Sequence, residues 1–540
     1  MTVRRSGIAP ATSRAAAPAR RERARLSTPA AAASASTDGA PHHQVALPAP
    51  EQIEALVDDA LCEASMRGIL VRERGRLRYS VHAPLSLLPT PLPRAPFEQV
   101  RALAPLVNTL VHRVSLDDAF LRAALAETIQ SDEFTARLFR IYETVELPRR
   151  SGGGGGGDSG RGARLGLHRA DYMLHTAEGA ARTMLQVEMN TISSSFAALS
   201  GKVSGLHKYL VGRHTSAHNG VQGGAHLVPD AYNAAAASLP DNRSSSFAAT
   251  GLAAAFELYN DPRAAVLMVV QDGEANRYDQ EWVTLELWEK FGISTLRASL
   301  AYVQEKGELT AAGGLRLDGH AVAVVYFRAG YTPDDYPSEV EWQGREKIEA
   351  SDAIKCPAID YHLVGAKKIQ QELAAPGALE RFMDPGDCAA LRACFAGLWT
   401  LEEGDVVQQA IEAPQNFVLK PQREGGGNNL YGEELRDALQ RLQSGSVQDR
   451  AAYILMQRIF PPSNPAVLVR NGEWSVEETL SELGVYSIFL SDGTSAANDD
   501  SNSGVLVNEA HGHLLRTKSA TSDEGGVAAG FAVLDSPLLY

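Results

Sequence analysis

The residues best suited to chemistry lie in FVLKPQREGGGNNLYGEEL, residues 417–435, where an apolar run ends in a lysine and a glycine-rich loop follows. The three consecutive glycines are Gly425, Gly426 and Gly427. Glycines let backbone N–H groups approach an anion closely, Lys420 supplies a positive charge, and Glu424 supplies an oxygen of the kind that magnesium prefers. A Walker-type G-K-[ST] sequence is absent. The stretch is suited to nucleotide phosphates, but three glycines taken alone are more typical of a flexible turn.

A second candidate stretch is MLQVEMN, residues 184–190, followed by three serines. We expect a strand whose alternation places Gln186, Glu188 and Asn190 on one face, so that a carboxylate and a carboxamide project together as magnesium requires. The serines that follow either donate hydrogen bonds to a substrate or cap a helix that starts at Phe196, and the sequence leaves both open.

Apolar runs further along predict an α/β unit. AVLMVV at 265–270 and VAVVYFR at 322–328 are typical of buried parallel strands, and EWVTLELWEK at 281–290 is typical of a crossover helix. Ligands of such sheets bind beyond the carboxyl ends of the strands. Polar residues at those ends, suited to an amino-acid-like substrate, are Glu274, Asn276, Gln280, Arg328 and Tyr331.

The C-terminal part contains two more informative stretches. AAYILMQRIFPP, residues 451–462, predicts a buried strand that lines an adenine pocket, with SELGVYSIFL at 481–490 as its pairing partner. The last stretch is HGHLLRTKSATSDEGGVAAGFAVLDSP, residues 511–537, in which Arg516 and Lys518 are two residues apart and so project from one face. His511 and His513 lack a third ligand nearby, so we expect loop histidines there and no zinc site.

Composition limits the possible function classes. The 540 residues require two or three structural units, and 44% hydrophobic with 21% charged residues is ordinary for a globular protein. A net charge of −14 argues against nucleic-acid binding through a basic surface, and no apolar stretch is long enough to span a membrane. The four cysteines have no C-x-x-C spacing, so neither a zinc site nor a disulfide framework is expected.

The N-terminal region differs from the rest of the chain. Residues 1–45 are rich in arginine, alanine and serine, which is typical of a plastid or mitochondrial transit peptide, with a disordered tail on a cytosolic protein as the alternative. Apolar spacing at 51–70 and 100–129 predicts scaffold helices. Six glycines from Gly152 to Gly157 predict a linker.

Four separate blocks carry a resemblance to a known family. FVLKPQREGGGNNLYGEEL, VEMNTISSSF, KCPAIDYHLVGAKKIQQEL and HLLRTKSATSDEGGVAAGFAVLD are similar to blocks of the eukaryotic glutathione synthetases. The resemblance implies a mixed α/β chain with an ATP-grasp fold, an inserted parallel α/β substrate-binding domain and a helical N-terminal scaffold. It places the boundaries at 1–45 for the leader, 46–253 for the scaffold with its glycine-rich insertion at 151–160, 254–366 for the substrate-binding domain, and 367–540 for the ATP-grasp domain.

The resemblance also implies an activity and its partners. Such enzymes join γ-glutamylcysteine to glycine while ATP becomes ADP and phosphate, need Mg²⁺, act as homodimers, and bind neither nucleic acid nor membrane. The small Ala528 and Ala529 favour glycine over β-alanine as acceptor. Two alternatives stay open: a homoglutathione-type or other ATP-grasp carboxylate–amine ligase, and a nucleotide-binding protein that has lost catalysis.

The resemblance assigns site residues position by position. It implies that magnesium is held by Glu188, Asn190 and Glu424. It implies that ATP is bound by Glu188, Lys367, Lys420, Glu424, Gly425, Gly426, Gly427, Asn428, Asn429, Tyr431, Met456, Gln457, Arg458, Ile459, Glu482, Lys518 and Glu524. It implies that the substrate is bound by Arg169, Ile192, Ser193, Ser194, Ser195, Glu274, Asn276, Gln280, Arg328, Tyr331, Arg516, Val527 and Ala528. Departures from the family pattern are Gln457 and Arg458 for Glu and Lys, Glu524 for Asp, and Ala275 for Arg.

The chemistry expected of these residues follows from charge. A carboxylate that attacks the γ-phosphate needs its negative charges neutralised, which Lys367, Lys420 and the metal provide. The amine then attacks the acyl phosphate, and Arg516 and Arg169 stabilise the oxyanion. Arg169, Arg516 and Lys420 are therefore the expected catalytic residues. The glycine loop and the GGVAAG loop are expected to close and exclude water.

Overall fold

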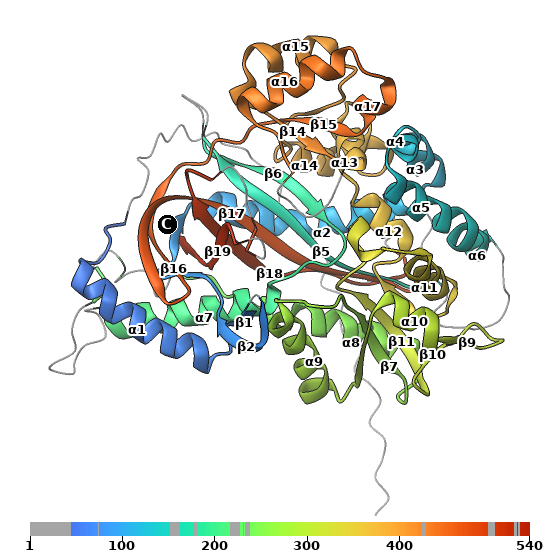
Figure 1. Cartoon of the computed structure of the whole chain (residues 1–540), viewed down its shortest axis with the longest axis horizontal. Helices are drawn as coiled ribbons and strands as arrows, with labels where there is room; N and C mark the ends of the chain where they lie inside the picture. The colour runs from blue at the N-terminus through green and yellow to red at the C-terminus, as the bar shows by residue number, and fades with distance from the viewer. Residues whose placement is uncertain are drawn as a thin grey trace, which may run out of the picture. The chain divides into compact units, whose positions relative to one another are not determined.

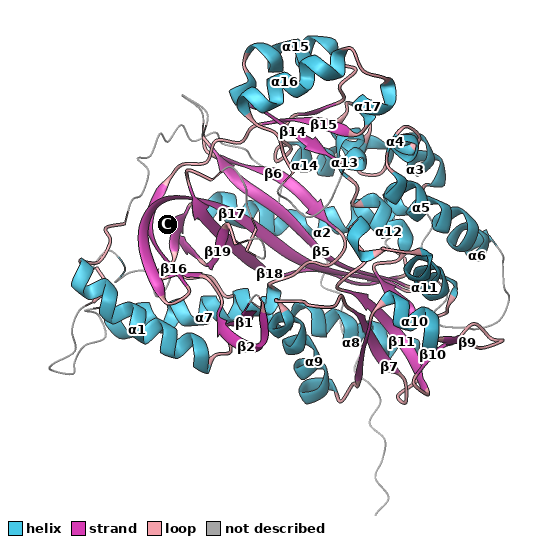
Figure 2. Cartoon of the chain, viewed as in Figure 1, coloured by secondary structure: helices cyan, strands magenta, loops and turns pink. Residues whose placement is uncertain are grey.

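The largest sheet has seven strands (Figures 1 and 2) and carries six of the predicted site residues: Arg169, Glu188, Asn190, Glu482, Arg516 and Lys518. Its order is β16-β3-β19-β18-β17-β5-β6, and all its pairings are antiparallel except that between β19 and β3. The bounds are β3 Leu85–Ser86, β5 Arg164–His175, β6 Thr183–Asn190, β16 Asn464–Arg470, β17 Glu473–Ser491, β18 Val505–Ser519 and β19 Ala532–Asp535. The sheet therefore joins strands from both the 46–253 and the 367–540 segments.

The computed structural model describes residues 45–73, 75–151, 162–176, 181–215, 227–229, 232, 238–422, 428–494, 503–522, 526–527 and 530–540. Residues 40–540 form one unit. Several predictions lie outside the described residues: the leader up to residue 44, the Gly152 to Gly157 run, the metal ligand Glu424, the loop Gly425 to Gly427, Glu524 and Ala528.

A second sheet is the predicted α/β unit. Its order is β8-β7-β11-β10-β9 with β12 on β11, and β7, β8, β11 and β12 are parallel. The strands are β7 Ala265–Val269, β8 Thr295–Ala298, β9 Glu308–Leu309, β10 Leu315–Leu317, β11 His320–Phe327 and β12 Ile354–Cys356. The helices of this part are α8 Phe247–Tyr259, α9 Arg277–Phe291, α10 Leu300–Lys306 and α11 Glu339–Ala350. Every residue of β7 is buried, as its continuous apolar run predicts.

A small third sheet holds the lysine of the glycine-rich stretch. Its order is β13-β15-β14, with β13 Leu398–Trp399, β14 Phe417–Pro421 and β15 Tyr453–Gln457. The helices α15 Gly404–Glu412, α16 Gly432–Gln443 and α17 Val447–Ala451 belong to this part (Figure 1). The prediction that residues 481–490 pair with β15 is wrong, because this stretch is the middle of β17 and pairs with β5 and β18.

The remaining elements are mostly helices. They are α1 Pro50–Met66, α2 Arg94–Ser115, α3 Asp118–Leu125, α4 Thr128–Ser131, α5 Glu133–Ile141, the π-helix η1 Tyr142–Glu146, α6 Leu147–Ser151, α7 Ala197–His214, α12 Ile359–Val364, α13 Lys367–Ala374 and α14 Pro385–Arg392. Short 3₁₀ turns are η5 Ser244–Ser246, η6 Pro333–Asp335, η7 Leu379–Arg381 and η8 Pro414–Asn416. Two-stranded pairs are β1 Leu70–Glu73 with β2 Arg76–His82, and β4 Thr90–Leu92 with β20 Pro537–Leu539.

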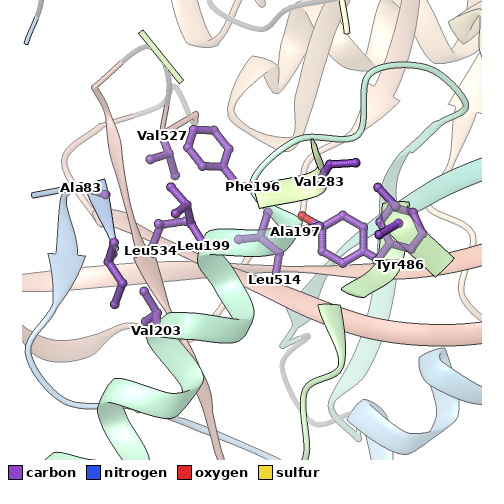
Figure 3. Packing of buried hydrophobic residues seen from close by; sticks show 14 of the residues in the cluster. Ala83, Phe196, Ala197, Leu199, Val203, Val283, Tyr486, Leu514, Val527 and Leu534 are labelled. Atoms are coloured by element: carbon purple, nitrogen blue, oxygen red, sulfur yellow. The ribbon is translucent and has the colours of Figure 1, made fainter. Parts of the chain in front are cut away.

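The core lies on both faces of the seven-stranded sheet. Alternate residues of β17 enter two clusters, since Leu483 and Val485 pack with α2 residues whereas Tyr486 and Ile488 pack with α7 and α8 residues. Figure 3 shows part of the second cluster, in which Phe196 lies beside Val527. The two helical layers fix the sheet that carries the site. No helix in the described part of the chain is long and apolar enough to cross a membrane.

Candidate active site

A cleft with a cavity volume of about 290 Å³ gathers many of the predicted site residues. It is lined by residues of β5, β6, β14, β17 and β18, by α5 and by the segment from α12 to α13. Predicted residues in its wall are Arg169, Glu188, Asn190, Ile192, Ser193, Ser195, Tyr331, Lys367, Lys420, Asn428, Asn429, Glu482, Arg516 and Val527. Further lining residues that the sequence did not indicate are Asp132, Phe134, Thr135, Leu138 and His362.

Two lysines face the carboxylate of Glu188. Lys420 is the last residue but one of strand β14, Lys367 begins helix α13, and both are buried. The ammonium group of Lys420 donates to the carbonyl oxygen of Val187 at 3.1 Å. Burial by itself raises the pKa of Glu188, but the charges of Lys367, Lys420 and the nearby arginines outweigh it and lower the pKa to about 2. Glu188 is therefore ionised and is suited to bind a divalent cation.

A bulge in β6 decides which of its side chains reach the cleft. Asp171 pairs with Glu188 and Tyr172 pairs with Gln186, so Val187 is the extra residue. Glu188 and Asn190 line the cleft, whereas Gln186 lines a separate small apolar cavity with Phe395. Strict alternation predicted all three polar side chains on one face, and the bulge removes Gln186 from it.

An arginine cluster forms the floor of the cleft. Arg169 makes two bonds of 2.7 Å to the carboxylate of Asp171 through Nε and an Nη atom. Arg516 donates to the same carboxylate at 3.0 Å and also to Glu482. Asn190 donates to Asp171 at 3.1 Å. Asp171 escaped the sequence reasoning, although its i, i+2 spacing from Arg169 on a strand would place the two on one face.

The serine turn is held by an acid from another helix. Helix α7 begins at Ala197, and none of the preceding serine side chains caps it. Asp279 of α9 accepts bonds from the N–H groups of Phe196 at 2.8 Å and Ala198 at 3.1 Å. Of the two readings that the sequence left open, the serine cap is therefore wrong, and the cap comes from 83 residues away.

The backbone of this turn is strained. Ser193 and Phe196 have φ angles of 53° and 67°, in the left-handed region that bulky residues avoid. Ser193 donates to the carbonyl oxygen of Phe327, and Tyr486 donates to that of Ser195. The hydroxyl of Ser194 is buried without a partner among the described residues. Tertiary contacts thus fix a turn that aims polar groups towards the cleft.

The carboxyl ends of β7 and β11 bring the expected substrate residues together. The carboxylate of Glu274 accepts bonds from the backbone N–H of Asn276 at 2.6 Å and from the side chain of Gln280 at 3.4 Å. Arg328, which is 4% exposed, donates to Asp279 at 3.3 Å. Glu274, Asn276, Gln280 and Arg328 do not line the cleft, whereas Tyr331 does. They lie behind the serine turn. Asp279 connects Arg328 to this turn, because it pairs with Arg328 and accepts a bond from the N–H of Phe196.

The segment expected to meet adenine lies on β15, outside the cleft wall. Met456 packs in a small apolar cluster with Leu185 of β6 and Ala396, which connects the two sheets. The backbone N–H groups of Gln457 and Arg458 donate to Gly397 and Asn416. Ile459 packs against the same cluster, Arg458 lies over the Tyr431 ring at 5.4 Å, and Lys518 is on β18. An adenine contact from this segment would therefore use groups other than those two N–H groups.

Metal-binding alternatives receive no support. Among the described residues no group of three or more His, Cys, Asp or Glu could hold a metal ion. The expectation of loop histidines is wrong, because His511 and His513 are buried residues of β18; His511 contacts Glu509 and Ser246. The four cysteines, all within the described ranges, are free thiols. The only cation site that the sequence predicted is the one that includes Glu424, which lies outside the described residues.

Comparison with known proteins decides the family. A family model described as eukaryotic glutathione synthase, ATP binding domain, matches residues 50–539. The chain belongs to the eukaryotic glutathione synthase family. Relatives of this family include a chloroplastic glutathione synthetase from Solanum lycopersicum, 46% identical over 90% of this chain and 84% of its own length. Another from Arabidopsis thaliana is 46% identical over 90% of this chain and 85% of its own, and the Homo sapiens glutathione synthetase is 38% identical over 90% and 97%.

A solved structure matches the fold of this glutathione synthase family member. It is a glutathione synthetase-like effector from Globodera pallida in its apo form, with a TM-score of 0.70 and 21% identity over 92% of this chain and 100% of the other. The family resemblance and the mixed α/β fold class predicted from the sequence are confirmed. The domain boundaries and the roles of the individual site residues stay predictions.

Proposed function

We propose that this chain makes glutathione by joining γ-glutamylcysteine to glycine, with ATP converted to ADP and phosphate through an acyl phosphate. Family membership supports the use of ATP. The observation that carries the proposal is the cleft itself, in which Lys367, Lys420, Arg169 and Arg516 surround Glu188. Four cations in one wall suit a reaction between two anions, a carboxylate and a phosphate.

We propose Mg²⁺ as the metal, held by Glu188, Asn190 and Glu424. The donor set suits the ion, because Asn190 lines the cleft and uses its amide nitrogen on Arg169 and Asp171, which leaves its carbonyl oxygen for a cation. Glu188 is kept ionised by the surrounding cations. When bound, the ion would neutralise charge on the nucleotide phosphates. Glu424 lies outside the described residues, so its part rests on the family resemblance.

The protein groups divide the remaining work. Lys367 and Lys420 neutralise the phosphates during phosphoryl transfer, and Arg169 and Arg516 stabilise the oxyanion when the amine attacks. The serine turn holds the dipeptide by its polar groups, and the Glu274 to Gln280 segment supports that turn through Asp279. Nothing in this scheme needs a covalent enzyme intermediate. The acyl phosphate must be kept from water, which is the role we assign to the loops at Gly425 to Gly427 and at 526–530.

Glycine is the proposed acceptor. The small residues Ala528 and Ala529 favour glycine over β-alanine, as the family resemblance implies. The two acceptors differ by one methylene, which is worth about 1 to 3 kcal/mol, so the preference for glycine need not be absolute. Turnover with glycine against β-alanine at equal concentration tests this and separates the homoglutathione-type alternative. Equal rates would contradict the assignment.

Two further proposals concern assembly and location. We propose a homodimer, as the family resemblance implies, and light scattering of the purified protein would give twice the mass of the 57.9 kDa chain. We propose a plastid location, supported by the chloroplastic relatives at 46% identity and by the arginine-rich leader. A fluorescent fusion of residues 1–45 should enter plastids, and mitochondrial or diffuse cytosolic signal would contradict the proposal.

A direct assay tests the proposed activity. Purified protein should release ADP only when γ-glutamylcysteine, glycine and Mg²⁺ are all present. ADP release with a different dipeptide in preference would favour another ATP-grasp ligase. Nucleotide binding without turnover would favour a protein that has lost catalysis.

A further inference from the structure

Asp171 lies at the centre of the arginine cluster, yet it does not itself line the cleft. It is fully buried on β5, two residues from Arg169, so both side chains project from the same face. Its carboxylate accepts two bonds from Arg169, one from Arg516 and one from Asn190. One buried acid therefore holds three side chains that do line the cleft.

The neighbouring strand leaves room for this arrangement. Gly484 of β17 pairs with Asp171 in the sheet. A Cβ atom at position 484 would lie 2.8 Å from Oδ1 of Asp171 and 2.9 Å from Cδ of Arg169. The backbone of Gly484 is not in the left-handed region. Glycine is needed at this position because a larger residue would not fit. The Arg169–Asp171 pair thus occupies a volume that any other residue at 484 would fill.

The bonds to Asp171 determine which guanidinium atoms remain for a ligand. Arg169 uses Nε and one Nη on Asp171, and its other Nη has no partner among the described residues. Arg516 donates to Asp171 and Glu482 through one Nη, while its buried Nε has no partner in the described part of the chain. The second Nη of Arg516 likewise has no partner among the described residues, so each of these two cleft-lining side chains keeps one Nη for a ligand.

We propose that Asp171 is a positioning residue for the ligase reaction, a role that rests on the function proposed above. It fixes both guanidinium groups so that the second Nη of Arg169 and the second Nη of Arg516 are left for the reacting carboxyl group. Through Asn190 it also orients the carboxamide proposed for the metal. Asp171 contacts no substrate and transfers no proton.

The test is the isosteric variant Asp171→Asn. Its amide nitrogen cannot accept from an arginine, so one of the two parallel bonds to Arg169 is lost and the guanidinium groups rotate. We expect kcat to fall about 100-fold, as for a misplaced catalytic group. The Mg²⁺ concentration for half-maximal rate should rise, because Asn190 loses its support. The KM for ATP should change little, since the bonds of Asp171 run to Arg169, Arg516 and Asn190.

A matched control is Glu146→Gln. Glu146 is also fully buried and also bridges two arginines, Arg149 at 2.9 Å and Arg164 at 2.6 Å, but it does not line the cleft. This variant should lose stability and keep the wild-type kcat and Mg²⁺ dependence. If Asp171→Asn does not fold, Asp171→Glu keeps the charge, lengthens the side chain by one methylene, and should also lower kcat.

The outcomes separate this role from the proposed function. A folded Asp171→Asn or Asp171→Glu enzyme with wild-type kcat and Mg²⁺ dependence overturns the positioning role, whatever its stability. A loss of kcat in Glu146→Gln as large as in Asp171→Asn also overturns it, since any buried bridging acid would then give the effect. A wild-type protein that forms no glutathione overturns the proposed function, and the positioning role with it.

Discussion

Replacing Asp279 by alanine should damage stability and substrate binding by two separable routes. Asp279 caps helix α7 through the N–H groups of Phe196 and Ala198 and pairs with Arg328 at 3.3 Å. The carboxylate is 2% exposed, so water cannot take over these bonds. The substitution therefore releases both the serine turn and the arginine.

The size of the stability loss follows from these contacts. Arg328 is 4% exposed, and a buried charge left without its partner costs about 3 to 5 kcal/mol. Loss of the helix cap adds about 1 kcal/mol. The total is about 4 to 6 kcal/mol. In the double variant Asp279→Ala with Arg328→Met no charge stays buried alone, so most of the 3 to 5 kcal/mol should return.

Substrate binding should respond differently. Arg328 is a predicted dipeptide-binding residue, and it is displaced in one variant and replaced in the other. The charged hydrogen bond lost to the dipeptide is worth about 1.5 to 3 kcal/mol. The KM for γ-glutamylcysteine should therefore rise about 10- to 100-fold in both variants, while the KM for ATP stays near wild type. Urea unfolding and steady-state kinetics on both variants measure the two effects. The reasoning is refuted if the double variant recovers no stability, or if Asp279→Ala binds the dipeptide as wild type does.

Three further predictions concern charge in and near the cleft. Lys420→Ala should fold normally but release no ADP in a coupled assay, because the γ-phosphate loses its buried cation; near-normal turnover would contradict this. Chelation of Mg²⁺ should stop ADP release, and Glu188→Gln should raise the Mg²⁺ needed for half-maximal rate; an unchanged Mg²⁺ titration would remove Glu188 from the metal site. Burial raises the pKa of Asp535 from 3.8 to about 6 against the hydroxyl donors Thr517 and Thr90. Because the folded state favours the protonated form, wild-type stability should fall by about 3 kcal/mol as pH rises from about 4 to about 6, and Asp535→Asn should lack this fall in urea titrations at each pH.

Local patterns in the sequence predicted the elements whose hydrogen bonds or burial are determined nearby. The continuous apolar runs at 265–270 and 322–328 form parallel strands β7 and β11, and the helix predicted at 281–290 lies within α9. The proline-rich stretch at 82–97 has no strand periodicity, but it contains β3 and β4. These short strands gain their bonds from β16, β19 and β20, at the other end of the chain. Their identity depends on tertiary partners, which local periodicity does not contain.

In the candidate site, too, local patterns were predictable and tertiary partners were not. Side-chain period indicated that Glu188 and Asn190 share a face, but only the paired strand reveals the bulge that removes Gln186. Asp279 escaped notice because its partner Phe196 lies 83 residues away, and the spacing of Asp171 from Arg169 does not reveal its bond to Arg516, 345 residues away. The assignments of Lys367 and Arg516 came from the family resemblance, since a lone lysine or arginine has no distinctive spacing. Acids that position catalytic groups are therefore harder to predict than the groups themselves.

The central claim is that one cleft couples phosphoryl transfer to amide formation. It is tested most directly by incubating the purified chain with ATP and Mg²⁺ and measuring ADP and tripeptide together, with γ-glutamylcysteine and glycine omitted in turn. We predict equal amounts of ADP and glutathione when both substrates are present, and no sustained ADP release when either is missing. Steady ADP release without the dipeptide, or ADP without glutathione when all components are present, would contradict the account.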